Sequence, residues 1–168
     1  MFLLRTTNRR WDAPVNAPWL PAGQIHADPL ADLKTEDNKL SVWTVFNDAS
    51  NLQRIVAALA ANRENLSRFE YALVDEHAVA VGGFTVVPSP GNTPDAEANK
   101  LWHNDVVDLS GNRLVDLAVI MSQHMSRNRY EKDEVVDLIA LGIADQRFPR
   151  SKLKPSVRAT FPETGPSA

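Results

Sequence analysis

The stretch from residue 40 to residue 74 constrains the fold most, because it predicts a strand, a helix and a second strand in succession. Residues 40–46 (LSVWTVF) carry apolar side chains on both parities, which is typical of a strand covered by other parts of the protein. The apolar residues that follow have the spacing of one helix face: Leu52, Ile55, Val56, Leu59 and Ala60. Residues 69–74 (FEYALV) return to a strand pattern. A helix can connect two parallel strands, so the pattern allows a parallel pair within the sheet.

The chain before this unit predicts an extended N-terminal arm. Residues 2–4 can form a short strand, after which four prolines prevent long helices: Pro14, Pro18, Pro21 and Pro29. Asp28 suits an N-cap and Pro29 suits a first helical position, which predicts one short helix. The arm contains two large side chains, Trp11 and Trp19, which could be exposed as an interface or buried against the core. We favour burial, with the arm wrapped around the core.

Residues 78–87 (AVAVGGFTVV) have two alternative assignments. Their β-type residues favour a strand that forms a hairpin with residues 69–74 and has a bulge at the glycine pair. The alternative is one helical turn followed by a strand over residues 84–87. We prefer the hairpin strand.

Three helices are predicted in the second half of the chain. Thr93 suits an N-cap and Pro94 suits a first helical position, so a helix is expected over residues 94–109. Ser110 can cap the next helix. The inward face of this helix carries Leu114, Leu117, Ala118, Met121 and Met125. After a polar joint, a last helix is expected over residues 130–146.

Together these elements predict an α+β fold, in which a small mixed or antiparallel sheet, mainly from the first half, packs against helices mostly from the second half. Residues 1–148 are expected to form a single globular domain with an extended arm at residues 1–37. Residues 149–168 contain several prolines and predict a basic tail that is partly disordered. Leu153 and Val157 are the side chains expected to dock part of this tail.

Composition limits the functional classes. The 168 residues carry a formal net charge of −3, which argues against a protein that acts mainly by gripping nucleic acid. The absence of cysteine excludes disulfides, thiolate metal sites and cysteine nucleophiles. No apolar run approaches the ~20 residues that a membrane span needs, and the N-terminus lacks the pattern of a secretory signal. A cytoplasmic protein is therefore expected.

No motif in the sequence defines a reaction. A glycine-rich phosphate loop, HExxH and G-x-S-x-G are all absent, and neither a metal nor a cofactor is expected. The weak catalytic candidates are two histidines near carboxylates, His77 and His103, and two arginines, Arg127 and Arg129. On the predicted helix, His103 and Asp105 would not share a face. We favour ordinary structural roles for all of these residues.

Two basic segments near the ends of the chain are the better binding candidates. They comprise Arg5, Arg9, Arg10 and Trp11 in the arm, and Arg150, Lys152, Lys154 and Arg158 in the tail. If the two segments meet in space, they form a cationic surface on an otherwise acidic protein. Such a surface suits an acidic partner or nucleic-acid phosphates.

The sequence therefore predicts a non-enzymatic accessory protein that binds another macromolecule, such as an adaptor or an antitoxin- or immunity-like subunit of a bacterial multi-protein system. A protein partner is expected first, and nucleic acid, bound through the basic termini, second. The alternative is a small hydrolase or transferase acting on a nucleotide or nucleic acid, with the four catalytic candidates converging in one cleft. A third hypothesis is a homo-oligomer. Deleting the residues after Arg147 is expected to abolish association and to leave folding nearly intact.

Overall fold

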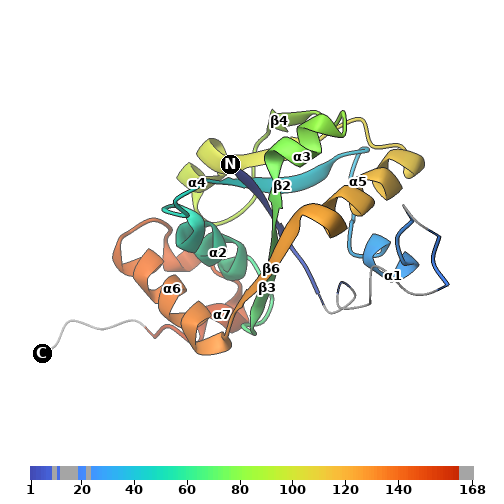
Figure 1. The fold of residues 1–168 in the computed structure, drawn as a ribbon. Coiled ribbons are helices and arrows are strands. Elements are labelled where there is room, and N and C mark those ends of the chain that lie inside the picture. The colour runs from blue at the N-terminus through green and yellow to red at the C-terminus, as the bar shows by residue number, and fades with distance from the viewer. Residues whose placement is uncertain (9–10, 12–18, 22–23, 163–168) are drawn as a thin grey trace, which may run out of the picture.

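The computed structural model describes residues 1–8, 11, 19–21 and 24–162, which form an α+β fold around a six-stranded sheet (Figure 1). The sheet has the order β4-β5-β2-β1-β3-β6, and all neighbours are antiparallel. The strands are β1 (Phe2–Thr6), β2 (Leu40–Val45), β3 (Phe69–Asp75), β4 (Val86–Pro88), β5 (His103–Val106) and β6 (Met125–Tyr130). The helices are α1 (Ala27–Leu30), α2 (Leu52–Ala61), α3 (Glu76–Val81), α4 (Ala96–Trp102), α5 (Gly111–His124), α6 (Lys132–Ala144), the 3-10 turn η2 (Arg150–Lys152) and α7 (Pro155–Arg158). The predicted α+β class is confirmed.

The short apolar strand β1 occupies the middle of the sheet. Leu4 lies opposite Trp43 of β2 on one side and opposite Leu73 of β3 on the other. β2 and β3 therefore run in the same direction but are separated by β1, so the parallel pair that α2 could have connected does not form. The three apolar residues at the start of β1 fit this position, because a strand covered on both faces needs apolar side chains on both parities.

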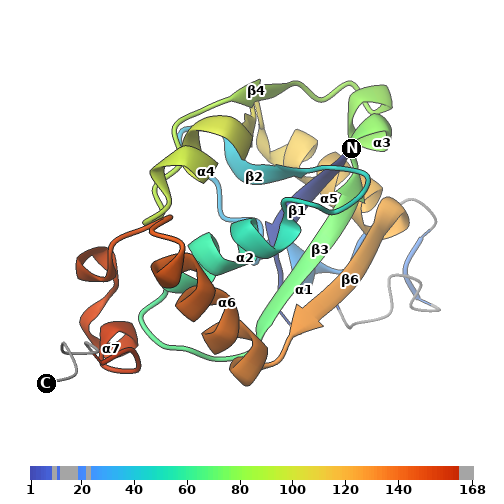
Figure 2. The ribbon, with the colours of Figure 1, turned by 90° about the vertical axis from the view of Figure 1, so that its left-hand side faces the viewer.

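Helices cover both faces of the sheet. α2 and α6 pack on one face, and Figure 2 shows them in front of the strands, with α5 behind. The alternation along β2 produces this division, since Trp43 and Val45 belong to the core under α2 and α6, whereas Leu40 and Val42 belong to the core under α5. We call the two sides the α2/α6 face and the α5 face. No helix in the described part of the chain is long and apolar enough to cross a membrane.

The segment after β3 differs from the preferred assignment. Helix α3 begins directly at the end of β3, because the Asp75 side chain accepts a hydrogen bond from the His77 backbone N–H (3.0 Å) and so caps the helix. The hairpin strand preferred for residues 78–87 is therefore wrong. The alternative of a helical turn followed by a strand is closer, with β4 beginning at Val86.

The long helix expected over residues 94–109 is also wrong. α4 has Asp95 as its N-cap, in place of Thr93, and it ends at Trp102. The chain then enters β5 at once, where pairing with β2 buries His103. Four residues are too few to show a periodic pattern, so this strand has no local signal in the sequence.

The polar joint expected between the last two helices is the edge strand β6. Every residue from Met125 to Tyr130 pairs with β3. Tyr130 stacks on Tyr71 with 5.9 Å between the ring centroids, and burial raises the pKa of Tyr71 to about 12. Arg127 and Arg129 suit the position of β6 at the edge of the sheet, because charged side chains discourage pairing with a strand of another chain. The helices on either side, α5 with Ser110 as its N-cap and α6, lie close to where they were expected.

The described part of the C-terminal tail packs on the α2/α6 face. Leu153 and Val157 are buried, as expected, and Phe148 lies in the same core. Phe148 fits against Gly142 of α6, where an added Cβ would lie 2.7 Å from the phenyl ring. Residues 163–168, on which part of the predicted disorder falls, lie outside the described residues.

Asp32 holds the described part of the N-terminal arm. Its carboxylate accepts hydrogen bonds from the Asn8 backbone (3.1 Å), the Asn8 side chain (2.7 Å) and the Trp11 indole (2.9 Å). Trp11 is 4% exposed, as expected, whereas Trp19 is 69% exposed, so the expectation that Trp19 is buried is wrong. The N-cap of the short helix α1 is His26, in place of Asp28.

We expect Asp32→Ala to lower the free energy of unfolding by about 2–3 kcal/mol, because the indole and amide donors would lose a charged acceptor. Asp28→Ala is the matched control, since this carboxylate is in the same segment, is 64% exposed and contacts His26 at the surface. Its effect should stay below about 0.5 kcal/mol. Urea denaturation followed by circular dichroism measures both variants, and equal midpoints would show that Asp32 does not anchor the arm.

Candidate functional site

The two basic segments do not form one surface in the described part of the chain. Trp11 packs on the α5 face, whereas Leu153 and Val157 of the tail pack on the α2/α6 face. Figure 1 shows α1 and α7 well apart, consistent with this division. Arg9 and Arg10 lie outside the described residues.

The arginines of the tail bind carbonyl groups of the tail itself. Arg158 donates to the carbonyls of Ser151 and Leu153 (2.7 and 2.9 Å). Arg150 donates to the carbonyl of Phe161, which lies past the end of α7. These contacts join the turns on either side of the buried Leu153, so both arginines stabilise the docked conformation of the tail.

The other cations of the two segments are placed differently. Lys154 lies 3.3 Å from Glu64, and Lys152 is exposed. Arg5 donates from Nη1 to the Ser41 carbonyl oxygen (2.9 Å), between β1 and β2. The structure thus gives most of the predicted binding residues an intramolecular partner, and their role toward another molecule stays a prediction.

The four catalytic candidates do not all lie on one surface. His103 is on the α2/α6 face because it pairs with Trp43, whereas Arg127 is on the α5 face, opposite Ala72 of β3. His77 is exposed at the start of α3, and Arg129 is exposed on β6. This placement contradicts the convergence in one cleft that the enzyme hypothesis requires.

β5 places His103 and Asp105 on the same face, contrary to the expectation for a helix, because alternate residues of a strand share a face. Asp105 accepts a hydrogen bond from the Ser41 hydroxyl (3.3 Å). The Nδ1 atom of His103 lies 2.9 Å from the Ser89 hydroxyl. The imidazole and the carboxylate therefore contact different serines.

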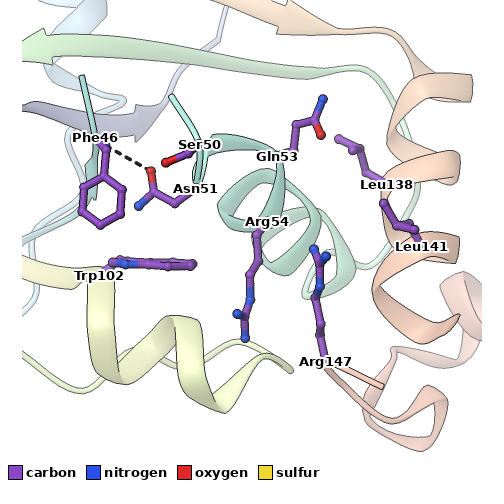
Figure 3. A pocket seen from close by; sticks show the side chains of 9 residues that line it. All are labelled: Phe46, Ser50, Asn51, Gln53, Arg54, Trp102, Leu138, Leu141 and Arg147. Atoms are coloured by element: carbon purple, nitrogen blue, oxygen red, sulfur yellow. Dashed lines mark hydrogen bonds between the residues drawn. The ribbon is translucent and has the colours of Figure 1, made fainter. Parts of the chain in front are cut away.

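A groove of about 350 Å³ lies between α2, α4 and α6 (Figure 3). We call it the α2/α4/α6 groove. It was not identified from the sequence. Its lining residues are Phe46, Ser50, Asn51, Gln53, Arg54, Trp102, Leu138, Leu141 and Arg147.

One wall of the groove is aromatic. Phe46 and Trp102 meet edge to face, with 6.3 Å between ring centroids and an interplanar angle of 84°. Asn51 fixes the turn that carries Phe46, since its side chain accepts from the Phe46 backbone N–H (3.0 Å) and donates to the Thr44 carbonyl (3.0 Å). Phe46 is nevertheless 40% exposed, so its ring is available to a ligand in the groove.

The opposite wall is aliphatic and comes from α6. Leu138 is partly buried against the core, whereas Leu141 is 48% exposed. Figure 3 shows both leucines at the other end of the groove from Phe46 and Trp102, with Gln53, Arg54 and Arg147 in between. A peptide segment that spans the groove would contact aromatic groups at one end and aliphatic groups at the other.

Two guanidinium groups lie between the walls (Figure 3). Arg54 donates to both oxygens of the buried Asp95 (2.7 and 2.9 Å) and to Glu97 (2.6 Å). The hydrogen bond to Asp95 is the main cause that raises the pKa of Arg54, so this cation stays charged. Arg147 lies 2.6 Å from Asp145. Each positive charge in the groove is therefore accompanied by a carboxylate at its edge.

The groove has the groups to bind a ligand, and its described lining contains no histidine or carboxylate that could act as a general base. Ser50 donates its hydroxyl hydrogen to Asp48 (2.8 Å). No group of three or more His, Cys, Asp or Glu residues that could hold a metal ion occurs in the described part of the chain.

Sequence reasoning missed the groove because its walls come from distant segments. Phe46, Trp102 and Leu141 are each an ordinary apolar residue in their own local pattern. The sequence held one usable signal of an exposed apolar surface. Leu141 is a leucine that falls outside the inward-facing series of α6. No family model, curated protein or solved structure matches this chain.

Proposed function

We propose that this chain is a non-enzymatic, cytoplasmic accessory protein that holds a short segment of a protein partner in the α2/α4/α6 groove. The segment would cover the apolar side chains at the ends of the groove and place a carboxylate against the guanidinium groups between them. The observation that carries this proposal is the pair of exposed apolar side chains, Phe46 and Leu141, at the two ends of one groove. Such a role fits an adaptor or an antitoxin- or immunity-like subunit of a bacterial system.

The composition of the groove favours a protein partner. Aromatic residues and arginine are enriched in the centres of protein–protein interfaces. Here Phe46 and Trp102 supply the aromatic surface, and Arg54 and Arg147 supply donors beside it. The exposed side chains of Phe46 and Leu141 leave apolar surface in contact with water. A ligand that covers this surface is stabilised by about 25 cal/mol per Å² of apolar surface buried.

The charges favour one carboxylate over a nucleic-acid backbone. A guanidinium has five N–H donors, so Arg147 has donors beyond the one that contacts Asp145. The carboxylates of Asp145 and Glu97, which are 40% and 65% exposed, stand at the edge of the groove. They would repel a series of phosphates, whereas a single carboxylate can still reach Arg147.

Selection from a displayed random-peptide library tests this proposal. Peptides are enriched on the wild-type protein and depleted on Phe46→Ser. We expect a consensus with one large apolar residue followed or preceded by Asp or Glu. Fluorescence anisotropy of a labelled consensus peptide should then show binding about tenfold or more weaker to Leu141→Lys, a loss of at least ~1.4 kcal/mol.

Leu101→Lys is the matched control. Leu101 is also an exposed leucine, 56% accessible, and it lies next to Trp102 on α4, but it does not line the groove. Its peptide affinity should equal that of the wild type. Selection that yields no consensus, or a consensus peptide that binds Leu141→Lys as tightly as wild type, would contradict the proposal. Self-association, the third hypothesis, predicts instead a mass that rises with protein concentration in sedimentation experiments.

A further inference from the structure

The two edges of the sheet differ in how they are protected. β4 has three residues and ends at Pro88, which has no backbone N–H, so little of this edge can pair with another strand. β6 has six residues without a proline, and Figure 2 shows it beside β3 at the margin of the sheet. In the described part of the chain, no strand pairs with its outer side. β6 is therefore the edge to which a further strand can be added.

The register of the sheet determines which backbone groups of β6 point outward. The Thr7 N–H donates to the Glu70 carbonyl oxygen (3.1 Å), so Glu70 directs its backbone groups toward β1. Successive residues of a strand direct these groups to opposite sides, so Tyr71 directs its groups toward β6, where it lies opposite Asn128. Asn128 therefore directs its own groups toward β3, and its two neighbours in β6 direct theirs away from the sheet.

The same alternation assigns three outward-directed residues to β6: Met125, Arg127 and Arg129. Their side chains share the α5 face, because alternate residues of a strand lie on one face. The Arg127 guanidinium contacts the Asn8 carbonyl oxygen (3.2 Å) and Glu70 (3.7 Å). Arg129 is 63% exposed, and its Nε lies 2.8 Å from Glu131. A guanidinium has five N–H donors, so Arg129 can bind a second carboxylate.

The positive charge of this edge discriminates between possible added strands. A second copy of β6 that paired antiparallel about a two-fold axis at Arg127, Asn128 or Arg129 would place an arginine opposite an arginine. Like charges directly opposite each other destabilise a pair of strands, whereas opposite charges stabilise it. The charge that discourages a second copy therefore favours an acidic strand.

We propose that β6 binds an extended acidic segment of a protein partner, which adds an antiparallel strand to the sheet. The segment would have acidic residues opposite Arg129 and Arg127, and an apolar residue opposite Met125. An aromatic residue opposite Tyr130 would extend the stack of Tyr130 on Tyr71. This surface shares no residue with the α2/α4/α6 groove, so the proposal does not depend on binding in the groove.

The test uses the full chain and the capped peptide Tyr-Glu-Thr-Glu-Thr-Leu, titrated in ¹⁵N–¹H correlation spectra. We expect saturable shifts in β6 and slower hydrogen exchange of the Met125 and Arg129 amides, because the added strand accepts hydrogen bonds from them. Methylation of the two glutamate nitrogens, which would point toward β6, should weaken binding about tenfold or more. Methylation of the two threonine nitrogens, which would point away, should change the affinity less than about twofold.

Arg129→Glu should weaken binding of this peptide about fivefold or more and strengthen binding of Tyr-Lys-Thr-Lys-Thr-Leu. Lys100→Glu makes the same change of net charge at an exposed position on α4, away from β6, and should leave the affinity unchanged. Leu141→Lys, which tests the groove, should also bind this peptide as the wild type does.

Three results would overturn the proposal. The first is that the acidic peptide shows no saturable binding. The second is that methylation of the threonine nitrogens weakens binding as much as methylation of the glutamate nitrogens. The third is that Arg129→Glu has no larger effect than Lys100→Glu.

Discussion

A chain that ends at Arg147 is expected to lose its cooperative unfolding transition. The deletion removes Phe148, Leu153 and Val157, each of which is at most 2% exposed in the core under α2 and α6. Burial of three such side chains contributes about 5–9 kcal/mol in total. This is comparable to the whole stability of a typical domain, about 5–15 kcal/mol. The structure therefore replaces the sequence-based expectation that this deletion leaves folding nearly intact.

Two further chains make the test specific. A chain ending at Pro162 keeps all three side chains and should unfold at the same urea concentration as the full chain. Phe148→Ala alone should lower the free energy of unfolding by about 3–5 kcal/mol, because α6 is shaped around the ring at Gly142. Near-UV circular dichroism during urea titration measures all of them. A cooperative transition with an unchanged midpoint in the chain ending at Arg147 would show that the tail is not part of the core.

Arg54→Met is expected to destabilise the protein by about 3–5 kcal/mol, because it leaves the fully buried Asp95 carboxylate without its cation. Asp95 would retain one hydrogen bond, from the Ala98 backbone N–H at the start of α4 (2.9 Å). Methionine preserves much of the packing of the arginine stem and loses only the guanidinium, whose Cζ lies over the Trp102 ring at 5.3 Å from the centroid. The loss should thus come mainly from the unpaired charge.

The same arginine supplies the control. Glu97 also accepts a hydrogen bond from Arg54 (2.6 Å), but its side chain is 65% exposed, so Glu97→Gln should cost at most about 1 kcal/mol. The double variant Arg54→Met/Asp95→Ser removes the buried charge and keeps an N-cap oxygen. It should be more stable than Arg54→Met alone in urea denaturation. Equal stabilities of these two variants would mean that the buried charge is not the cause.

The elements predicted correctly are those with a repeating apolar pattern. α2 and α6 show one helical face over three turns, and β2 and β3 are long apolar runs. β5 and β6 were missed because their sequences, HNDV and MSRNRY, are mostly polar, and only pairing with β2 and β3 makes them strands. The cap of α4 was misplaced for a related reason. Thr93 is a good local N-cap, but Asp95 also binds Arg54, which comes from another helix.

The candidate sites were less predictable than the fold. Histidines and arginines were selected by residue type, and the structure assigns most of them to surface positions or to carbonyl groups nearby. His103 is the candidate that lines a pocket, but its neighbours there, Arg5 and Trp43, come from other strands. The α2/α4/α6 groove depends on three helices meeting. No property of Phe46 or Leu141 within its own segment indicates that they line the same groove.

The central position of β1 has a consequence for the order in which the molecule assembles. β1 precedes both of its neighbours in the chain. In the described residues it is the only strand that pairs with both the half-sheet β4-β5-β2 and the half-sheet β3-β6. Neither half can join the other until β1 has found partners that are dozens of residues away. Folding of this kind depends on long loop closures and is slow compared with that of helical bundles. Until β1 is inserted, the edges of β2 and β3 that will pair with it have unpaired backbone groups. Other chains can pair with these edges, so the folding protein is most prone to aggregation at the strands that later form the centre of the sheet.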